Sequence, residues 1–248
     1  MQLLHGDCLE LMKSIPDGSV DMVLCDPPYG TTACKWDSII PFDKMWEQLN
    51  RIIKRGGVIC LFGSEPFSSA LRMSNINNYR YDWIWIKNNS TGFQMANKRP
   101  LKKHEIISVF YENQGNYFPQ GVIPFGKINR RGSMGDNWGE LKQNEYVQEY
   151  TNYPNSILKF DYDVDKLHST QKPIPLLQYL IKTYTVEGER VLDFTMGSGS
   201  TGVACKCINR KFIGIEKDDK YFEIAKQRIE NGFVQEDVNI NENSPLFE

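Results

Sequence analysis

The chain has 248 residues, of which 40% are hydrophobic and 24% charged, and its formal net charge at pH 7 is −2. This composition is that of a soluble globular protein, either one large domain or a domain with an insertion. No run approaches the roughly 18 apolar residues of a membrane-spanning helix, and the near-neutral charge means that any nucleic-acid-binding surface must be local.

The cysteines and the N-terminal residues indicate where the protein works. None of the six cysteines forms a C-x-x-C pair, and several lie in apolar patterns typical of a core. Reduced thiols of this kind are typical of cytoplasmic proteins. The first residues lack the basic-then-apolar pattern of a secretory signal. We therefore expect a cytoplasmic protein with no membrane segment and no metal site.

Strand-like and helix-like segments alternate through residues 1–112. Apolar residues such as Trp46 and Leu49 have helical spacing, and Gly56-Gly57 is expected to end that helix. Such alternation indicates a doubly wound, mostly parallel sheet, with its last two strands as an antiparallel edge. We expect strands over 2–6, 20–25, 58–62, 79–86 and 105–111, and helices over 8–15, 42–54 and 66–75.

The pattern breaks over residues 113–166, where Gly, Asn, Pro, Tyr and Gln are frequent and apolar periodicity is weak. We expect a small irregular insertion there, packed on the edge of the domain. Alternation returns over 167–232, so these residues and 1–112 form two halves of one domain, followed by a loose tail over 233–248. Aromatic side chains argue against plain disorder in the insertion, and they are Tyr117, Phe118, Phe125, Trp138, Tyr146, Tyr150 and Tyr153. The expected later elements are strands 190–194 and 212–216 and helices 174–184, 203–208 and 220–229.

Asp26-Pro27-Pro28-Tyr29 follows the apolar strand 20–25. The two prolines have no N–H to donate, so the chain must leave the sheet in a stiff turn. The turn places a carboxylate, carbonyl groups and an aromatic ring beside one another, which is an arrangement that can hold a flat, amino-bearing ring. The alternative is a plain loop at the end of a strand.

Gly197-x-Gly199-x-x-Gly202 lies between a predicted strand and a predicted helix, and Glu216 ends the next strand. Glycines let a ligand approach the backbone, and the acid can accept from ribose hydroxyls. Taken alone, the pattern indicates a nicotinamide- or flavin-dependent oxidoreductase. Asp193, however, disfavours a pyrophosphate and favours a ligand that carries an ammonium and a sulfonium. The loop therefore predicts an adenosine-containing cofactor, and the acids around it decide which one.

Together these elements resemble the amino-methylating (N6-adenine and N4-cytosine) DNA methyltransferases. Residues 26–29 are similar to the catalytic motif of that family, and 193–201 to its S-adenosylmethionine loop. Residues 168–173, His-Ser-Thr-Gln-Lys-Pro, resemble its H-x-T-Q-K-P element, and 6–8 the element that holds the cofactor's adenine. The order, with the catalytic motif first, is that of the family's beta group.

The resemblance implies a seven-stranded, Rossmann-like methyltransferase sheet with a circularly permuted chain order. Strands 190–194 and 212–216 would lie beside strand 2–6, and strand 20–25 next to 190–194. This order brings Asp26 and the Gly-rich loop together at the carboxyl edge of the sheet. The insertion would be the target-recognition segment.

The resemblance also implies S-adenosylmethionine as cofactor and double-stranded DNA as substrate, with the target base flipped out. Asp26 and the Pro27 carbonyl would accept from the amine, within the turn that Pro28 completes, and Tyr29 would stack on the base. Asp rather than Ser at position 26 favours the 6-amino group of adenine, and N4-cytosine methylation is the alternative. The implied cofactor-binding residues are Asp7, Cys8, Thr170, Lys172, Asp193, Phe194, Thr195, Gly197, Ser198, Gly199, Ser200, Thr201 and Glu216.

Some of these residues have simpler interpretations. Asp7 could cap the helix that begins at Cys8, and Glu216 could cap the helix that follows it, although Asp218 can fill that role instead. Lys172, which with Thr170 resembles residues that contact the methionine carboxylate, could be a solvated lysine.

Basic residues near the sheet edge and in the insertion are expected to meet DNA phosphates, although a basic run is more often a solvated loop. Residues 33–36 would form a flap over the site. The family likeness also makes a homodimer plausible, with helix 42–54 or 66–75 at the contact. The expected DNA contacts are Lys87, Lys98, Arg99, Lys102, Lys103, Arg130 and Arg131.

Overall fold

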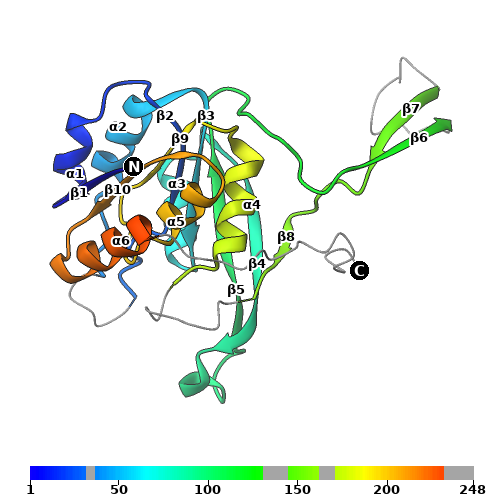
Figure 1. Cartoon of the computed structure of the whole chain (residues 1–248). Helices are drawn as coiled ribbons and strands as arrows, with labels where there is room; N and C mark the ends of the chain where they lie inside the picture. Colours follow the sequence, from blue (N-terminus) through cyan, green and yellow to red (C-terminus); the bar gives the residue numbers. More distant parts are fainter. Residues whose placement is uncertain (32–36, 131–144, 162–170, 232–248) are drawn as a thin grey trace. The chain divides into compact units, whose positions relative to one another are not determined.

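The computed structural model describes residues 1–31, 37–130, 145–161 and 171–231. It divides into two compact units, one made of Met1–Phe118 and Ser156–Glu248, the other of Pro119–Asn155. The first unit is an α/β domain with an eight-stranded sheet, and the second holds a two-stranded ribbon (Figure 1). Among the sequence predictions, the flap, Thr170, Arg131 and the tail lie outside the described residues.

The sheet of the first unit has the strand order β1-β10-β9-β2-β3-β5-β4-β8. All neighbouring pairs are parallel except β3–β5 and β4–β5, so β5 is the antiparallel strand. The prediction of seven strands was one short, because β8 comes from the stretch expected to be irregular and pairs with β4 at the edge. The strands are β1 (Gln2–His5), β2 (Val20–Cys25), β3 (Ile53–Gly63), β4 (Tyr79–Thr91), β5 (Lys102–Phe110), β8 (Ile157–Lys159), β9 (Arg190–Asp193) and β10 (Lys211–Glu216).

The predicted circular permutation is confirmed by the strand neighbours. β1, from the start of the chain, pairs with β10, and β10 pairs with β9. β2 lies on the other side of β9, so the strand that ends before Asp26 is next to the strand that ends at Asp193. All residues of β2 are buried, as its unbroken apolar run predicts.

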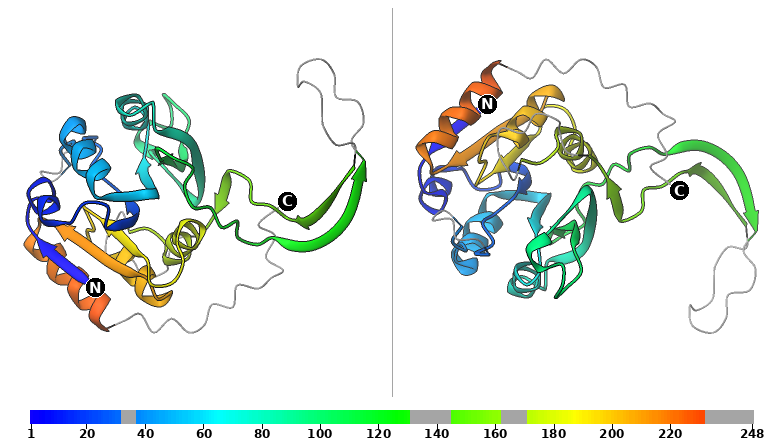
Figure 2. Two further views of the ribbon diagram at one scale, coloured as in Figure 1. Left: turned by 90° about the horizontal axis from the view of Figure 1, so that it is seen from above. Right: turned by 90° about the horizontal axis from the view of Figure 1, so that it is seen from below.

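The helices cover both faces of the sheet (Figures 1 and 2). Apolar residues of α1, α2 and α3 pack in one hydrophobic cluster, and those of α4, α5 and α6 pack in a second cluster against the opposite face. In α2, for example, Met45, Leu49 and Ile52 are buried at helical spacing. The helices are α1 (Cys8–Leu11), α2 (Phe42–Ile52), α3 (Phe67–Ser74), α4 (Ile174–Tyr184), α5 (Ser200–Cys207) and α6 (Asp219–Asn231), with 3₁₀ turns at Met12–Ser14 and Phe93–Met95.

The prediction that Gly56-Gly57 ends helix α2 was wrong. The helix ends at Ile52 and β3 begins at Ile53, so the two glycines lie inside the strand. The pairing register of β2 and β3 shifts at this place. Gly56 has φ +82°, and a Cβ at Gly57 would lie 2.9 Å from the carbonyl oxygen of Asp21. The glycines therefore allow a bulge where β3 comes close to β2.

The second unit also differs from the irregular insertion that the sequence predicts. Its strands β6 (Ile123–Arg130) and β7 (Glu145–Thr151) form an antiparallel pair, with a register shift between Pro124 and Lys127. A shift of this kind hides the period-two alternation that marks a strand in a sequence.

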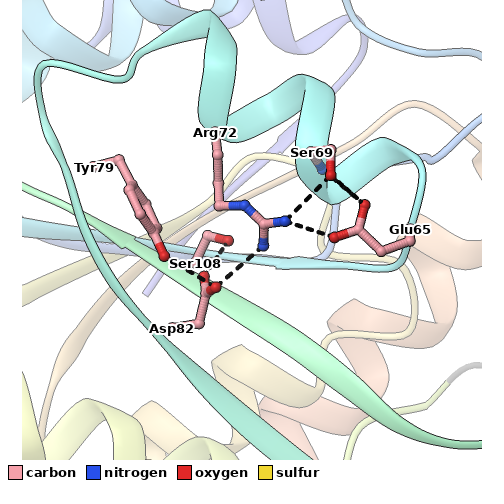
Figure 3. Close-up of polar contacts among 6 residues, drawn as sticks. All are labelled: Glu65, Ser69, Arg72, Tyr79, Asp82 and Ser108. Carbon is pink, nitrogen blue, oxygen red and sulfur yellow. Dashed lines mark hydrogen bonds and ion pairs between the residues drawn. The ribbon is translucent and has the colours of Figure 1, made fainter.

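A polar network ties α3 to β4 and β5 (Figure 3). The Arg72 guanidinium lies 2.5 Å from Glu65 Oε1 and 3.1 Å from Asp82 Oδ2. Asp82 also accepts hydrogen bonds from Ser108 Oγ at 2.7 Å and from the Tyr79 hydroxyl at 3.0 Å. The network fixes the antiparallel strands against the helix that follows β3.

The cysteines of the described residues are free thiols; Cys25, Cys60 and Cys205 are buried, whereas Cys207 is exposed. None of the helices in these described parts combines the length and the apolar character needed to span a membrane.

Candidate active site at the carboxyl edge of the sheet

A cavity of about 550 Å³ opens at the carboxyl ends of the parallel strands. Open α/β sheets place ligands at this edge, because the loops that follow neighbouring strands meet there. The four residues Asp26, Pro27, Pro28 and Tyr29 line it after β2. The expected cofactor-binding residues that also line it are Asp7, Cys8, Lys172, Asp193, Phe194, Thr195, Gly197, Ser198, Ser200, Thr201 and Glu216.

Both carboxylate oxygens of Asp26 accept hydrogen bonds from the protein itself. The Tyr29 hydroxyl donates to Oδ1, and the Lys172 ammonium donates to Oδ2. Burial raises the pKa of the Tyr29 hydroxyl, and the Asp26 carboxylate raises it further, so this hydroxyl stays protonated. Lys172 is only 8% exposed, which contradicts the interpretation of a solvated lysine.

The turn after β2, residues 26–29, is joined directly to the Gly-rich loop. Thr195, the second residue after β9, donates from its hydroxyl to the carbonyl oxygen of Asp26 at 3.1 Å. The same hydroxyl lies 3.0 Å from the Cys25 sulfur. A single side chain therefore fixes the turn after β2 relative to the loop after β9.

Asp37 holds the residues that follow this turn, and the sequence interpretation did not include it. Its two carboxylate oxygens accept from the backbone N–H groups of Gly30 and Thr31, at 2.8 and 2.9 Å. Asp37 is 9% exposed and lines the cavity. No periodic pattern surrounds this residue, so its position next to the motif was the only available signal.

Asp193 is a buried carboxylate on the floor of the cavity. Its Oδ2 accepts from the Thr201 hydroxyl at 2.7 Å, and its Oδ1 accepts from the backbone N–H of Thr195 at 3.2 Å. Burial raises the pKa of this carboxyl group to about 6, because the surrounding protein solvates the charged form poorly. Asp193 can therefore change its charge near neutral pH.

The three glycines of the loop have different roles. Gly197, with φ +51° and open space where a Cβ would be, lines the cavity and allows close approach of a ligand. Gly199 is not among the residues that line it. A Cβ on Gly199 would lie 2.9 Å from the Cβ of Ala225 and 3.0 Å from its Cα, and Gly202 similarly faces Ile229. These two glycines let α5 and the loop pack closely on α6.

The acids at the ends of β10 and β1 are partly engaged with the backbone. Glu216 accepts from the N–H groups of Gly197, Lys217 and Asp218, each at 2.8 Å, which leaves part of its acceptor capacity for a ligand. Asp218 caps α6 by accepting from Tyr221 N at 3.0 Å. Asp7 caps α1, as its simpler interpretation predicts, and it also lines the cavity.

The residues expected to contact DNA are divided by the structure. Lys98, Arg99 and Lys103 are exposed in and near the β4–β5 connection, and Lys102 is half-buried. Lys87 is only 4% exposed and lies 3.3 Å from Glu105, so the prediction that it meets DNA phosphates was wrong. Arg130 is the last residue of β6, and its side chain is outside the described residues.

The cavity fits a positively charged adenosine cofactor. Its volume of about 550 Å³ suits a small molecule. Among the described residues, Asp193 and Glu216 line it together with four other acidic residues, against two lysines, Lys172 and Lys217. No cluster of His, Cys, Asp and Glu in the described parts could hold a metal ion. The sheet order and this acid-lined cavity define an α/β protein of the S-adenosylmethionine-dependent methyltransferase class.

Comparison with known sequences identifies the family. A family model described as "DNA methylase", for N6 and N4 methyltransferases, matches residues 20–227, and the chain belongs to this family. It is 28% identical to the Type II methyltransferase M.HinfI of Haemophilus influenzae, over 92% of this chain and 67% of that protein. It is 26% identical to M2.LlaDCHI of Lactococcus lactis subsp. cremoris, over 93% of this chain and 89% of that protein. The chain is therefore a DNA methyltransferase, and the nicotinamide alternative is excluded.

Solved structures share the fold. The M1.HpyAVI–SAM complex aligns with a TM-score of 0.62 at 24% identity, covering 92% of this chain and 98% of that one. The cytosine-N4-specific PvuII methyltransferase aligns with a TM-score of 0.69 at 17% identity, covering 97% and 88% of the two chains. The family uses S-adenosylmethionine as its methyl donor.

Proposed function

We propose that the chain transfers the methyl group of S-adenosylmethionine to the 6-amino group of adenine at a specific DNA sequence. The observation that carries this proposal is the hydrogen bond between Thr195 and the carbonyl oxygen of Asp26. It fixes the amine acceptor of the catalytic turn beside the loop of the methyl donor. Aspartate rather than serine at position 26 supports adenine as the target base.

The chemistry follows from the weakness of an aromatic amine as a nucleophile. Asp26 and the Pro27 carbonyl accept the two N–H bonds of the amine, and this localises its lone pair on nitrogen. The nitrogen then bonds to the methyl carbon in line as the carbon–sulfur bond breaks, and the sulfonium becomes a neutral thioether. The proton leaves the nitrogen afterwards and is taken up by water. Positioning and fixed electrostatics are the main contributions of the protein.

Tyr29 is proposed to stack on the target base after the base leaves the duplex. The amine of a stacked, paired base is out of reach, so the nucleotide must rotate into the cavity. The Tyr29 ring lies 5.0 Å from the ring of Phe67, at an interplanar angle of 31°. This contact and the bond to Asp26 hold the phenol in one orientation, which supports its role as a stacking surface.

Residues 113–166 are proposed to recognise the target sequence. A two-stranded β-ribbon is a shape that enters the DNA major groove. Asn129 Nδ2 donates to Gln148 Oε1 at 2.9 Å across β6 and β7, and amide side chains are suited to adenine edges. The cross-strand pairs on either side of Ile128–Val147 lie on one face of the ribbon. That face carries four polar or aromatic residues, namely Lys127, Asn129, Tyr146 and Gln148.

The biological setting and assembly are also proposals. The relatives M.HinfI and M2.LlaDCHI are named Type II methyltransferases, and we propose that this chain likewise modifies the site of a partner endonuclease in the cytoplasm. A homodimer is proposed through α3, whose last turn and the residues after it expose Met73 (69%) and Ile76 (51%). Light scattering of the purified protein distinguishes a dimer from a monomer.

Tritiated S-adenosylmethionine tests the function directly. The protein is incubated with the labelled cofactor and DNA, and the DNA is then digested to nucleosides. We expect label in N6-methyladenosine with the wild type and none with Asp26→Ala. Asp43→Ala, which removes an exposed carboxylate of α2 outside the cavity, is the matched control and should retain activity. Label in N4-methylcytosine would contradict the assigned base, and no transfer by the wild type would contradict the function.

A further inference from the structure

In the resting site both carboxylate oxygens of Asp26 are already engaged by donors of the protein. Tyr29 donates to Oδ1 and Lys172 donates to Oδ2. If the proposed function is correct, the incoming amine competes with these two donors for the acceptor sites of Asp26. Tyr29 belongs to the turn itself, whereas Lys172 comes from the residues just before α4. Lys172 is therefore the donor that can leave without dismantling the turn.

A second carboxylate already lies beside the Lys172 ammonium. Glu105 Oε2, on β5, is 3.4 Å from Lys172 Nζ. This oxygen is buried and has no hydrogen-bond partner among the described residues. Because Lys172 itself is only 8% exposed, an ammonium that leaves Asp26 needs another buried carboxylate. Glu105 supplies one with a free acceptor site.

Lys87 holds Glu105 from the other side. Its ammonium lies 3.3 Å from Glu105 Oε1, and the lysine is 4% exposed on β4. Charges therefore alternate along one chain of contacts, Asp26, Lys172, Glu105 and Lys87. Burial alone would raise the pKa of the Glu105 carboxyl group, but Lys172 and Lys87 outweigh burial and hold it below its ordinary value. Glu105 is thus ionised and able to accept a second ammonium contact.

The Phe62 ring limits where Lys172 can move. Its centroid lies 5.0 Å from Lys172 Nζ, and Phe62 also lines the cavity. A cation is attracted to the face of such a ring, so the lysine keeps this contact while its ammonium turns between two carboxylates. Only the end of the flexible Lys172 side chain has to move.

We propose that Glu105 is a positioning residue of the methyl transfer, which takes over the Lys172 ammonium when the target amine binds Asp26 Oδ2. In the resting enzyme Lys172 neutralises Asp26 and keeps its oxygen engaged. When the base enters, Lys172 shifts to Glu105, and Oδ2 becomes free to accept from the amine. Lys87 keeps Glu105 in place throughout.

The Glu105→Gln variant tests this transfer, because glutamine keeps the shape but removes the charge that receives Lys172. At saturating cofactor we expect kcat to fall about tenfold or more, while the Kd for DNA stays within about twofold. Asp82→Asn is the matched control, since Asp82 of β4 is also a half-buried carboxylate and has a cationic partner, Arg72 of α3 (Figure 3). It should lower the melting temperature and leave kcat within about twofold.

A double-mutant cycle separates positioning from a general structural effect. With Lys172→Met as background, Glu105 has no ammonium to receive, so Glu105→Gln should change kcat by less than about twofold. An equal loss on both backgrounds, or an unchanged kcat in Glu105→Gln alone, would overturn the proposal. If Glu105→Gln does not fold, Glu105→Ala, which also lacks the carboxylate, makes the same comparison on both backgrounds with the same criterion. Failure of the proposed function itself is distinguished by the absence of methyl transfer in the wild type.

Discussion

At the scale of single residues, the buried carboxylate of Asp193 has a pH-dependent consequence. Its pKa is raised from 3.8 to about 6, so the folded state binds a proton more tightly than the unfolded chain. Its contribution to the stability of the ligand-free protein is therefore present at low pH and is lost as the pH rises from about 4 to about 6. The affinity for a cationic cofactor should instead rise with pH over this range, because the ligand prefers the ionised carboxylate.

Calorimetric titration with S-adenosylmethionine measures that trend. We expect the Kd to be about tenfold higher at pH 5 than at pH 7, with proton release on binding below pH 6. Asp193→Asn should bind more weakly and show little dependence on pH over the same range. A wild-type Kd that stays constant from pH 5 to 7 would show that Asp193 does not meet the positive charge of the cofactor.

Asp37 permits a second prediction, because it bonds two backbone N–H groups of the catalytic turn. Asp37→Ala leaves both donors without this partner and loosens the turn. We expect kcat/KM for DNA to fall about tenfold or more, with the cofactor Kd within about twofold. Asp37→Asn, which has one carbonyl oxygen, should give an intermediate loss. Equal activity of all three proteins would mean that the turn is held without Asp37.

At this scale, the sequence predicted the residues of the site better where a local motif marks them than where they depend on contacts between strands. Asp26 and Asp193 each follow from one local pattern. Glu105 and Lys87 depend on which strands are neighbours, and no local pattern reveals that. The alternation of Trp83, Trp85 and Lys87 did carry a usable signal, since it puts all three on the buried face of β4.

At the scale of secondary-structure elements, two glycine variants measure how much the close packing of the Gly-rich loop on α6 contributes to stability. Gly199→Ala places a Cβ 2.9 Å from Ala225 at a backbone φ of +80°. Gly18→Ala meets the same kind of strain at φ +55° but has open space around it. We expect a loss in the free energy of unfolding of about 1 kcal/mol for Gly18→Ala, and of about 2–4 kcal/mol for Gly199→Ala because overpacking is added.

Chemical denaturation of the two variants gives the comparison. Similar losses in both would contradict the assignment of Gly199 to helix packing. Weaker cofactor binding without a larger loss of stability would instead support the predicted role of Gly199 as a ligand contact.

Element boundaries show where local sequence signals compete. Helix 174–184 was predicted with its observed limits, because prolines mark its start and apolar residues continue to Tyr184. Gly56-Gly57 misled the interpretation, since a glycine pair has the same appearance at a helix end and in a strand bulge. Only the approach of Gly57 to Asp21 in the sheet distinguishes the two.

At the scale of the whole molecule, the order of the motifs predicted the strand neighbours β1–β10–β9–β2, and the structure confirms them. The eighth strand could not be predicted. β8 has only three residues, and its pairing with β4 connects segments far apart in the sequence. The ribbon β6–β7 was missed for a related reason, because its register shift interrupts the alternation along β6.

The most direct test of the central claim is methylation-sensitive sequencing of DNA from cells that express the protein. We predict N6-methyladenine at one short recognition sequence in cells with the wild type, and none at that sequence in cells with Asp26→Ala. N4-methylcytosine in place of N6-methyladenine, or methylation that persists in the Asp26→Ala variant, would contradict the account of the active site.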